Sequence, residues 1–209
     1  MFGPRTYTPA THDHFHEVAT LFVNLASFNA ATESFSNSTS TQIPNSPGHT
    51  LNLMGRIAHV TFPVYTLMHG VVQNAWPTGL ELTILPASVQ PHSIPNGIQL
   101  QSNAILNMIV QLVGAAFLKY YERNANRPRK AFPKGPQTWP DLWRFAWLLR
   151  NAIAHGDTWA IDDPSFPVTQ WKSVSVAPKD SGNPWFDITR YIAGGDVLLL
   201  MEELNASNI

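Results

Sequence analysis

The sequence predicts a mostly α protein: a bundle of four to five helices with a small β hairpin near the C-terminus. Three observations predict this class. Apolar residues recur at helical spacing in long segments, strand-like alternation is confined to one late segment, and the absence of cysteine excludes a disulfide scaffold. The 209 residues are 44% hydrophobic, enough for a sizeable core, and fit one domain better than two. We predict a single domain over residues 1–209, with core helices at 13–156 and the hairpin and terminal helix at 168–205.

The first two predicted helices precede a long connection. In residues 13–34, large apolar side chains between Val18 and Phe28 repeat at helical spacing, and the polar stretch SNSTSTQIPNSPG follows. Residues 49–74 show a similar spacing, and we expect Pro63 to kink that helix. The proline-bearing connection over residues 76–97 is long for a loop, so short extra structure is expected there.

The third predicted helix covers residues 100–124 and is apolar over most of its circumference, so we expect a partner subunit to bury part of it. The fourth begins near Thr138, which can cap the first turn with Asp141 in the reciprocal capping-box position and Pro140 inside the turn. Gly156 supplies a left-handed exit at its end.

The remaining elements follow that exit. The stretch QWKSVSVAP, residues 170–178, alternates as a strand does, and we expect NPWFDI, residues 183–188, to pair with it across the intervening turn. A short amphipathic helix begun near Asp196 closes the chain.

The net charge and the distribution of apolar residues limit the classes of partner that we expect. A net charge of -1 and a pI near 6.7 give no global field for nucleic acid or an anionic membrane, so a polyanion would have to meet a local patch. The longest apolar run, residues 104–118, falls short of the roughly 20 residues that cross a bilayer. Residues 1–20 contain no unbroken apolar segment of the kind a secretory signal needs. We therefore expect a cytoplasmic protein with no membrane partner.

The stretch LLRNAIAHGDTW, residues 148–159, carries polar groups at the end of the fourth helix. Asn151 and His155 share a helix face, and Arg144 falls on the same side, whereas Arg150 points elsewhere on an ideal helix. A histidine can take a proton from a ribose 2′-hydroxyl or give one to a leaving 5′-oxygen, and an arginine can hold the phosphate. The same cations are also typical of a helix end that they merely cap.

The residues RNAIAHG, with Arg150, Asn151 and His155 at the end of a long amphipathic helix, resemble the R-x4-6-H motif of the HEPN superfamily. Only these seven residues are specific, although the likeness extends in outline over most of the chain. The resemblance implies an all-α, HEPN-like bundle of four to five helices that forms a homodimer, in which two motifs face each other across one cleft.

The resemblance also implies a function. Relatives with this motif include metal-independent endoribonucleases of toxin-antitoxin and anti-phage defence systems, so the expected protein is an RNA-cleaving hydrolase without a cofactor, with an antitoxin protein as a candidate partner. His155 would be the acid and base, Arg150 the group that holds the phosphate and the transition state, and Asn151 a positioning group. Because the superfamily includes inactive members, a catalytically inactive binding or dimerisation module is the alternative.

One toxin branch of the superfamily has a tyrosine two residues after the histidine, where a partner nucleotidyltransferase modifies it. Here Asp157 occupies that position, so we do not expect regulation by that route. Asp157 either orients His155 or belongs to the exit turn.

The stretch over residues 119–134 is a second candidate site for RNA binding. Its cationic side chains could track a phosphate backbone, and its aromatic side chains could stack on bases of single-stranded RNA. A solvated helix end explains the same charges. Trp147, near the motif face, is the tryptophan best placed to stack on a base. The cationic residues of this stretch are Lys119, Arg123, Arg127, Arg129, Lys130 and Lys134, interleaved with Tyr120, Tyr121 and Phe132.

The histidine-rich stretch THDHFHEV is the last candidate. His12 and His16 would share a helical face four residues apart, which is a usable spacing for metal ligands. No second group of ligands completes a site, so we predict no bound metal. A metal-dependent hydrolase that uses these histidines is the remaining alternative.

Overall fold

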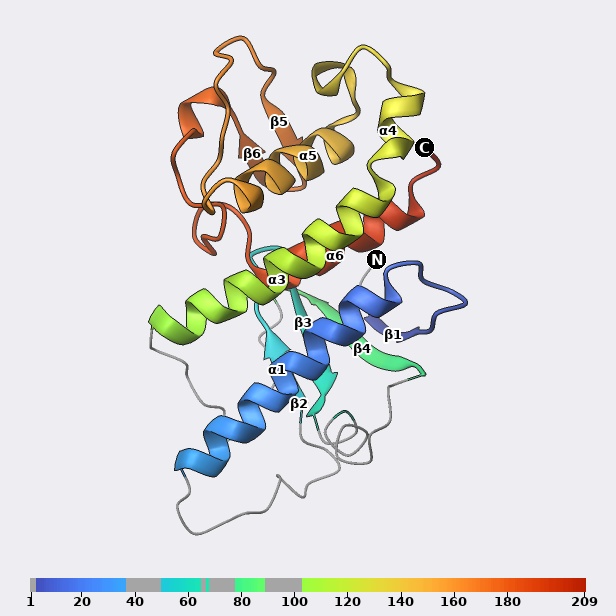
Figure 1. Ribbon diagram of the computed structural model, residues 1–209, viewed down its shortest axis with the longest axis vertical. Coiled ribbons are helices and arrows are strands. Elements are labelled where there is room, and N and C mark those ends of the chain that lie inside the picture. The colour runs from blue at the N-terminus through green and yellow to red at the C-terminus, as the bar shows by residue number, and fades with distance from the viewer. Residues whose placement is uncertain (1–2, 37–49, 65–66, 68–77, 89–102) are drawn as a thin grey trace.

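The structure, a computed structural model, describes residues 3–36, 50–64, 67, 78–88 and 103–209. Its fold is mixed α/β: a four-stranded antiparallel sheet with strand order β1-β4-β3-β2, a separate two-stranded hairpin, and helices packed around both (Figure 1). The predicted mostly α, HEPN-like bundle is therefore wrong. Several helices were placed correctly, but the sequence pattern did not reveal the sheet against which they pack.

The sheet consists of β1 (Gly3–Tyr7), β2 (Thr50–Leu53), β3 (Ala58–Pro63) and β4 (Leu80–Pro86). β4 is central: Tyr7 of β1 pairs with its Leu80, and Thr61 of β3 pairs with its Thr83. Leu80, Leu82 and Ile84 are buried and Glu81 between them is exposed, as expected for a strand with one face on the core.

The predicted helix over residues 49–74 is wrong for residues 50–63, whereas Val64 and Leu67 are helical. β2 and β3 occupy its first part, and residues 65–66 and 68–77 lie outside the described residues. Short apolar runs fit the helical and the strand period alike, and pairing with β4 decides in favour of strands. Pro63 ends β3 instead of kinking a helix. The predicted connection over residues 76–97 contains β4, which is the extra structure expected there.

The long helices α1 (Phe15–Ser36) and α3 (Asn103–Asn124) confirm the predictions for residues 13–34 and 100–124. α3 packs against α1, α5 and α6, and Val113, Phe117 and Tyr120 on it are buried within the chain. Packing within the chain therefore accounts for the apolar character of α3 over the part whose side chains the structure describes, residues 108–124. Among the described helices, none combines the length and the apolar character that a membrane crossing requires.

The helix that carries the motif, α5 (Asp141–Ala154), follows a short α4 (Asn126–Ala131) and a 3-10 turn, η1 (Pro136–Thr138). The predicted capping box is absent. The hydroxyl of Thr138 donates to the carbonyl of Gly135 at 2.9 Å, and α5 begins at Asp141 without a side-chain cap. Thr138 belongs to the η1 turn, which ends before α5 starts, so its hydroxyl does not cap α5.

A hairpin forms in this region, but the predicted pairing of residues 170–178 with residues 183–188 is wrong. β5 (Thr169–Trp171) pairs with β6 (Val174–Val176) across a turn in which Lys172 has a φ of 54°. Apart from Thr169, both strands thus lie within the stretch expected to be a single strand. The segment expected as its partner instead forms isolated bridges, including Phe186 with Ile192. A second 3-10 turn, η2 (Pro178–Asp180), follows β6.

The terminal helix α6 (Gly194–Ala206) is buried along most of its length instead of being amphipathic. It packs against β3, α3 and α5 (Figure 1). Its first turn meets the turn between β2 and β3 so closely that a Cβ on Gly195 would overlap the carbonyl oxygens of Leu53 and Ala58. Glycine is required there because the two backbones touch.

Asp196 fixes this contact. Its side chain is fully buried and accepts hydrogen bonds from the backbone N–H groups of Arg56 (2.6 Å), Ile57 (2.6 Å), Ala58 (2.9 Å) and Ala193 (2.9 Å). Burial raises the pKa of this carboxyl, and the amides oppose that shift because they stabilise the charged form. One side chain therefore satisfies the β2–β3 turn and caps α6 at the same time.

We predict that Asp196→Ala lowers the free energy of unfolding by about 3–5 kcal/mol, because it leaves buried amide donors without acceptors. Asp196→Asn should cost less, since its amide oxygen still accepts. Urea denaturation followed by circular dichroism measures both. The matched control is Glu81→Ala on the exposed sheet face, which should stay within about 0.5 kcal/mol of the wild type. An Asp196→Ala protein as stable as that control would contradict the capping role.

Candidate functional site

The polar motif lies where α5 stops and the chain reverses. His155 is the C-terminal cap of α5, and its N–H donates to the carbonyl of Asn151 at 3.0 Å. The next residue, Gly156, has a φ of 96°, which confirms the predicted left-handed exit. His155 is exposed and Asn151 half-buried. The helix end therefore presents the imidazole to solvent on a rigid support.

Asn151 and His155 line one open pocket of about 380 Å³. Trp147, one helical turn before Asn151, forms a wall and stacks on Phe166, with ring centroids 5.6 Å apart. The segment over residues 160–166 closes the other side. The structure thus brings together two of the three predicted catalytic residues and the tryptophan singled out from the sequence.

Arg150 does not line this pocket. Its Nε donates to Oε1 of Glu122 on α3 at 2.6 Å, and one terminal nitrogen donates to Oδ1 of Asn151 at 3.3 Å. Because this bond occupies Oδ1, the Nδ2 donors of Asn151 remain available to a ligand. Within one chain, Arg150 therefore contacts Glu122 and Asn151 and does not meet His155 at a common point.

Arg144, predicted on the same face as His155, is also held elsewhere. It forms an ion pair with Asp141 and donates to the carbonyl of Gln137 at 3.0 Å. Gln137 itself lines the pocket. Arg144 thus supports the rim of the pocket and does not reach into it.

Asp157 belongs to the exit turn and has a φ of 61°. Its carboxylate accepts from Nε2 of Gln111 on α3 at 2.8 Å and from Nε1 of Trp185 at 3.0 Å. Both carboxylate oxygens of Asp157 thus accept hydrogen bonds. Of the two roles considered from the sequence, a place in the exit turn therefore accounts for its contacts.

Two aspartates that the sequence reasoning missed, Asp162 and Asp163, line the pocket opposite α5. The hydroxyl and N–H of Ser165 donate to Asp163, and these hydrogen bonds lower the pKa of its carboxyl. Asp162 is exposed, and no hydrogen bond or ion pair joins it to another described residue. The sequence shows no motif at these two residues, because they join the pocket of His155 only through the course of the loop that follows Gly156.

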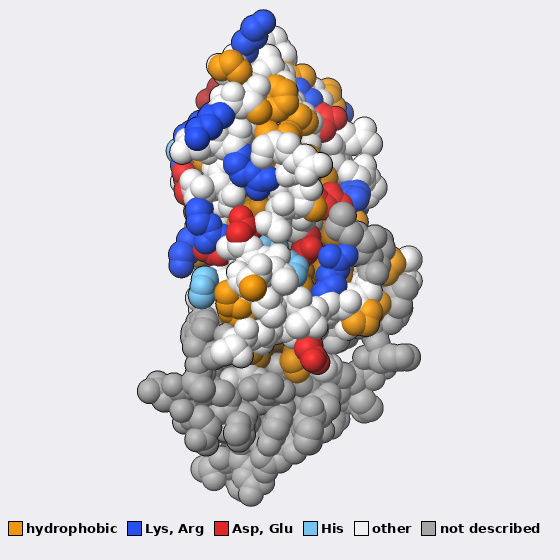
Figure 2. All heavy atoms as spheres, turned by 90° about the vertical axis from the view of Figure 1, so that its right-hand side faces the viewer, with side chains coloured by type: hydrophobic (Ala, Val, Ile, Leu, Met, Phe, Trp, Pro, Cys, Tyr) orange, Lys and Arg blue, Asp and Glu red, His pale blue; other side chains and the backbone are white. Residues whose placement is uncertain are grey.

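Several residues of the basic stretch over residues 119–134 make structural contacts within the chain or are buried. Arg123 bonds both carboxylate oxygens of Glu17, at 3.0 and 3.1 Å, and Arg127 bonds the carbonyls of Ser207 and Ile209. Tyr120 and Tyr121 are buried and cannot stack on exposed bases. On the face in Figure 2, Lys and Arg side chains are scattered among neutral and hydrophobic ones. Lys119, Arg129, Lys130 and Lys134 remain exposed.

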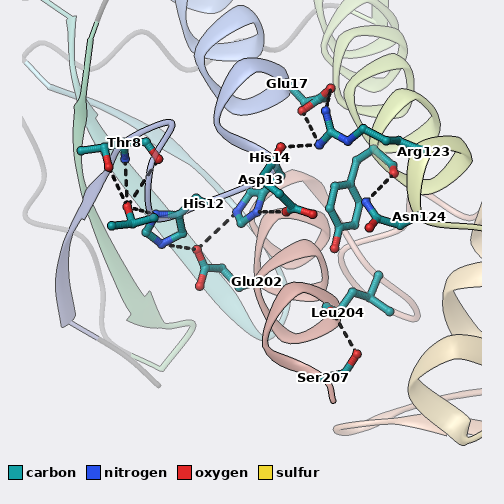
Figure 3. A network of polar contacts seen from close by, with 12 residues as sticks. Thr8, His12, Asp13, His14, Glu17, Arg123, Asn124, Glu202, Leu204 and Ser207 are labelled. Carbon is teal, nitrogen blue, oxygen red and sulfur yellow. Dashed lines mark hydrogen bonds and ion pairs between the residues drawn. The ribbon is translucent and has the colours of Figure 1, made fainter. Parts of the chain in front are cut away.

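A second group of polar side chains, which we call the amino-terminal cluster, comprises Tyr7, His12, His14 and Glu202. Figure 3 shows the last three of these residues. Nε2 of His14 lies 3.4 Å and Nε2 of His12 3.7 Å from Oε1 of Glu202, and Tyr7 stacks on His12 with centroids 4.3 Å apart. His14 and Glu202 are buried. The cluster ties β1 and the segment before α1 to α6.

The predicted face shared by His12 and His16 does not form, because α1 begins only at Phe15 and His12 lies in the preceding turn. Within the described part of the chain, no group of three or more His, Asp or Glu side chains is arranged to hold a metal ion. The described contacts of His12 and His14 are the stacking of His12 on Tyr7 and the approach of both imidazoles to Glu202.

A larger pocket of about 470 Å³ lies over the sheet and is lined mainly by threonines, with Arg5 and Glu81 as its charged residues. Arg5 already pairs with Glu202 at 3.1 Å. No imidazole or amide side chain lines this pocket. The smaller pocket at the end of α5 is therefore the better candidate for chemistry.

Comparison with known proteins adds no assignment. No family model matches the sequence, and neither a curated protein nor a solved structure gives a significant match. The resemblance to the HEPN motif therefore rests on residues 150–156 alone.

The amino-terminal cluster makes stability depend on pH. Burial lowers the pKa of His12. Burial by itself would raise the pKa of Glu202, but contacts from His14 and Tyr7 and the charge of Arg5 lower it overall. Both groups bind protons more weakly in the folded chain, so their contribution to stability is present at neutral pH. It is lost as the pH falls below about 6.5 for His12 and about 4.3 for Glu202.

We predict that Glu202→Gln lowers the free energy of unfolding by about 1.5–3 kcal/mol at pH 7. The difference from the wild type should shrink as the pH falls, because the wild-type carboxyl becomes neutral as well. Urea titrations at several pH values between 7 and 3 measure it, with Glu81→Gln as the control on the exposed sheet face. A difference that is the same at every pH would show that the charge of Glu202 is not responsible.

Proposed function

We propose that this protein is a metal-independent endoribonuclease whose reaction takes place in the pocket at the end of α5. The observation that carries the proposal is that His155, an exposed imidazole, shares one pocket with the amide of Asn151 and the aromatic face of Trp147. RNA cleavage without a metal requires proton transfer and contact with the phosphate, and an aromatic side chain can in addition stack on an unpaired base.

His155 would take the proton of a ribose 2′-hydroxyl, whose oxygen attacks the adjacent phosphorus. The bond from phosphorus to the 5′-oxygen breaks, and that oxygen receives a proton from an imidazolium. The products are a 2′,3′-cyclic phosphate and a free 5′-hydroxyl. The Nδ2 donors of Asn151, left available by its bond to Arg150, would hold a phosphate oxygen.

A single chain lacks one element of this mechanism. Among the described residues, no arginine or lysine lines the pocket beside His155, because Arg150 is held by Glu122. The pair is partly exposed, with 32% of the Arg150 and 48% of the Glu122 side-chain surface accessible, so a second copy could approach it. In a homodimer with facing motifs, Arg150 of one subunit would serve the phosphate bound beside His155 of the other.

The alternative is a binding module without turnover. The carboxylates of Asp162 and Asp163 favour it, because they repel a phosphate placed on their side of the pocket. A role as a toxin or in anti-phage defence, with an antitoxin partner in the cytoplasm, rests on the motif resemblance alone.

The first test is cleavage of total RNA by the purified protein in EDTA. We expect the wild type to produce 2′,3′-cyclic phosphate ends and His155→Ala to lose at least about 100-fold in rate, as expected for a lost acid-base group. Lys179→Gln, an exposed change remote from the pocket, should cleave as the wild type does. Equal cleavage by all three proteins, or none by a folded wild type, would favour the binding module.

The second test asks whether two chains share one site. Arg150→Ala and His155→Ala should each be inactive alone, but mixing them under conditions that exchange subunits should restore cleavage, because one of the two composite sites then holds both residues. Sedimentation measures the dimers in parallel. If mixed dimers form and cleavage does not return, Arg150 and His155 do not act across an interface.

A further inference from the structure

Trp147 separates two adjoining pockets. On one side lies the pocket of His155, and on the other a pocket of about 320 Å³ lined by Arg129, Phe132 and Trp139. Pro136 also borders both. The two pockets therefore adjoin and form one path past Trp147.

The two ends of this path differ in charge. Asp162 and Asp163 stand at the His155 end, and the lowered pKa of Asp163 keeps its carboxyl ionised. At the other end, Arg129 is exposed, and no ion pair with another described residue occupies it. A phosphate is repelled on the side of the two aspartates and attracted beside Arg129.

We infer that the path binds single-stranded RNA with a guanine base against Trp147 and Asp162 and the neighbouring phosphate at Arg129. This inference rests on the proposed function, because it assigns the substrate of the same pocket. Guanine presents two adjacent donors, N1–H and the N2 amine, and these match the two oxygens of one carboxylate. Asp162 is free to accept them, whereas Ser165 already occupies Asp163.

The chemistry of the other bases supports this choice. Uracil and hypoxanthine each offer a single ring N–H, and cytosine offers an amine beside an unprotonated ring nitrogen that a carboxylate repels. Stacking on Trp147 is open to all bases, so it gives affinity without selection. Asp162 therefore sets the preference, and Arg129 contributes equally to every sequence.

The test is binding, measured in EDTA by fluorescence anisotropy with fluorescein-labelled pentanucleotides in the His155→Ala background, which prevents cleavage. The four probes are UUGUU, UUIUU with inosine, UUCUU and UUUUU. We expect UUGUU to bind at least about fivefold more tightly than the others, the low end of discrimination by a paired hydrogen bond.

Two variants assign the preference to residues. Asp162→Asn should abolish the difference between UUGUU and UUIUU while UUUUU still binds, and Glu81→Gln should leave the difference intact. Arg129→Gln should weaken all four probes by a similar factor and reduce the salt dependence of binding, whereas Lys179→Gln should not. Circular dichroism verifies that each variant is folded.

Equal binding of all probes, no binding of any, or a guanine preference that survives Asp162→Asn would overturn the inference. Its failure can be told apart from failure of the proposed function. Cleavage without a base preference leaves the ribonuclease and removes the guanine site. A guanine preference that depends on Asp162, without cleavage by the wild type, leaves the binding site and removes the ribonuclease.

Discussion

The contact between the first turn of α6 and the turn joining β2 to β3 is the constraint on which the rest of the molecule depends. Asp196 accepts four backbone hydrogen bonds there, and Gly195 lets the two backbones touch. Since α6 also packs against α3 and α5, this one contact places the motif helix relative to the sheet. A buried carboxylate is costly unless its oxygens are fully used, and here the amides of two separate segments use them.

The end of α5 is fixed by a different set of bonds. Asp157 joins the exit turn to α3 and to Trp185, and Arg150 reaches Glu122 on α3. These bonds divide the motif: Asn151 and His155 face the pocket, and Arg150 faces α3. The division explains why the proposed reaction needs either a second copy or release of Arg150. It also leaves the imidazole on a support with little freedom to move, which suits a group that must meet a substrate in one geometry.

His14 and His155 differ in burial and in the contacts of their side chains. His14 is buried beside Glu202, and its neighbours come from β1 and α6. His155 is exposed in an open pocket beside free donors and acceptors. A buried imidazole beside a buried carboxylate joins distant segments, whereas an exposed imidazole with no side-chain partner among the described residues is available to a ligand. Both histidine-containing stretches were candidates in the sequence, but only the structure shows that His14 is buried and His155 exposed.

The sequence by itself determined the helices at residues 15–36 and 103–124, the glycine exit after His155 and the last helix, because their signals are local: helical spacing and a residue that tolerates positive φ. The tertiary structure alone decided the sheet, since β1 and β3 become strands by pairing with β4, which is remote from β1 in the chain. It also decided that Arg150 turns to Glu122 and that Asp162 reaches the pocket. Each of these depends on a partner far along the chain, and no local pattern encodes where that partner will lie.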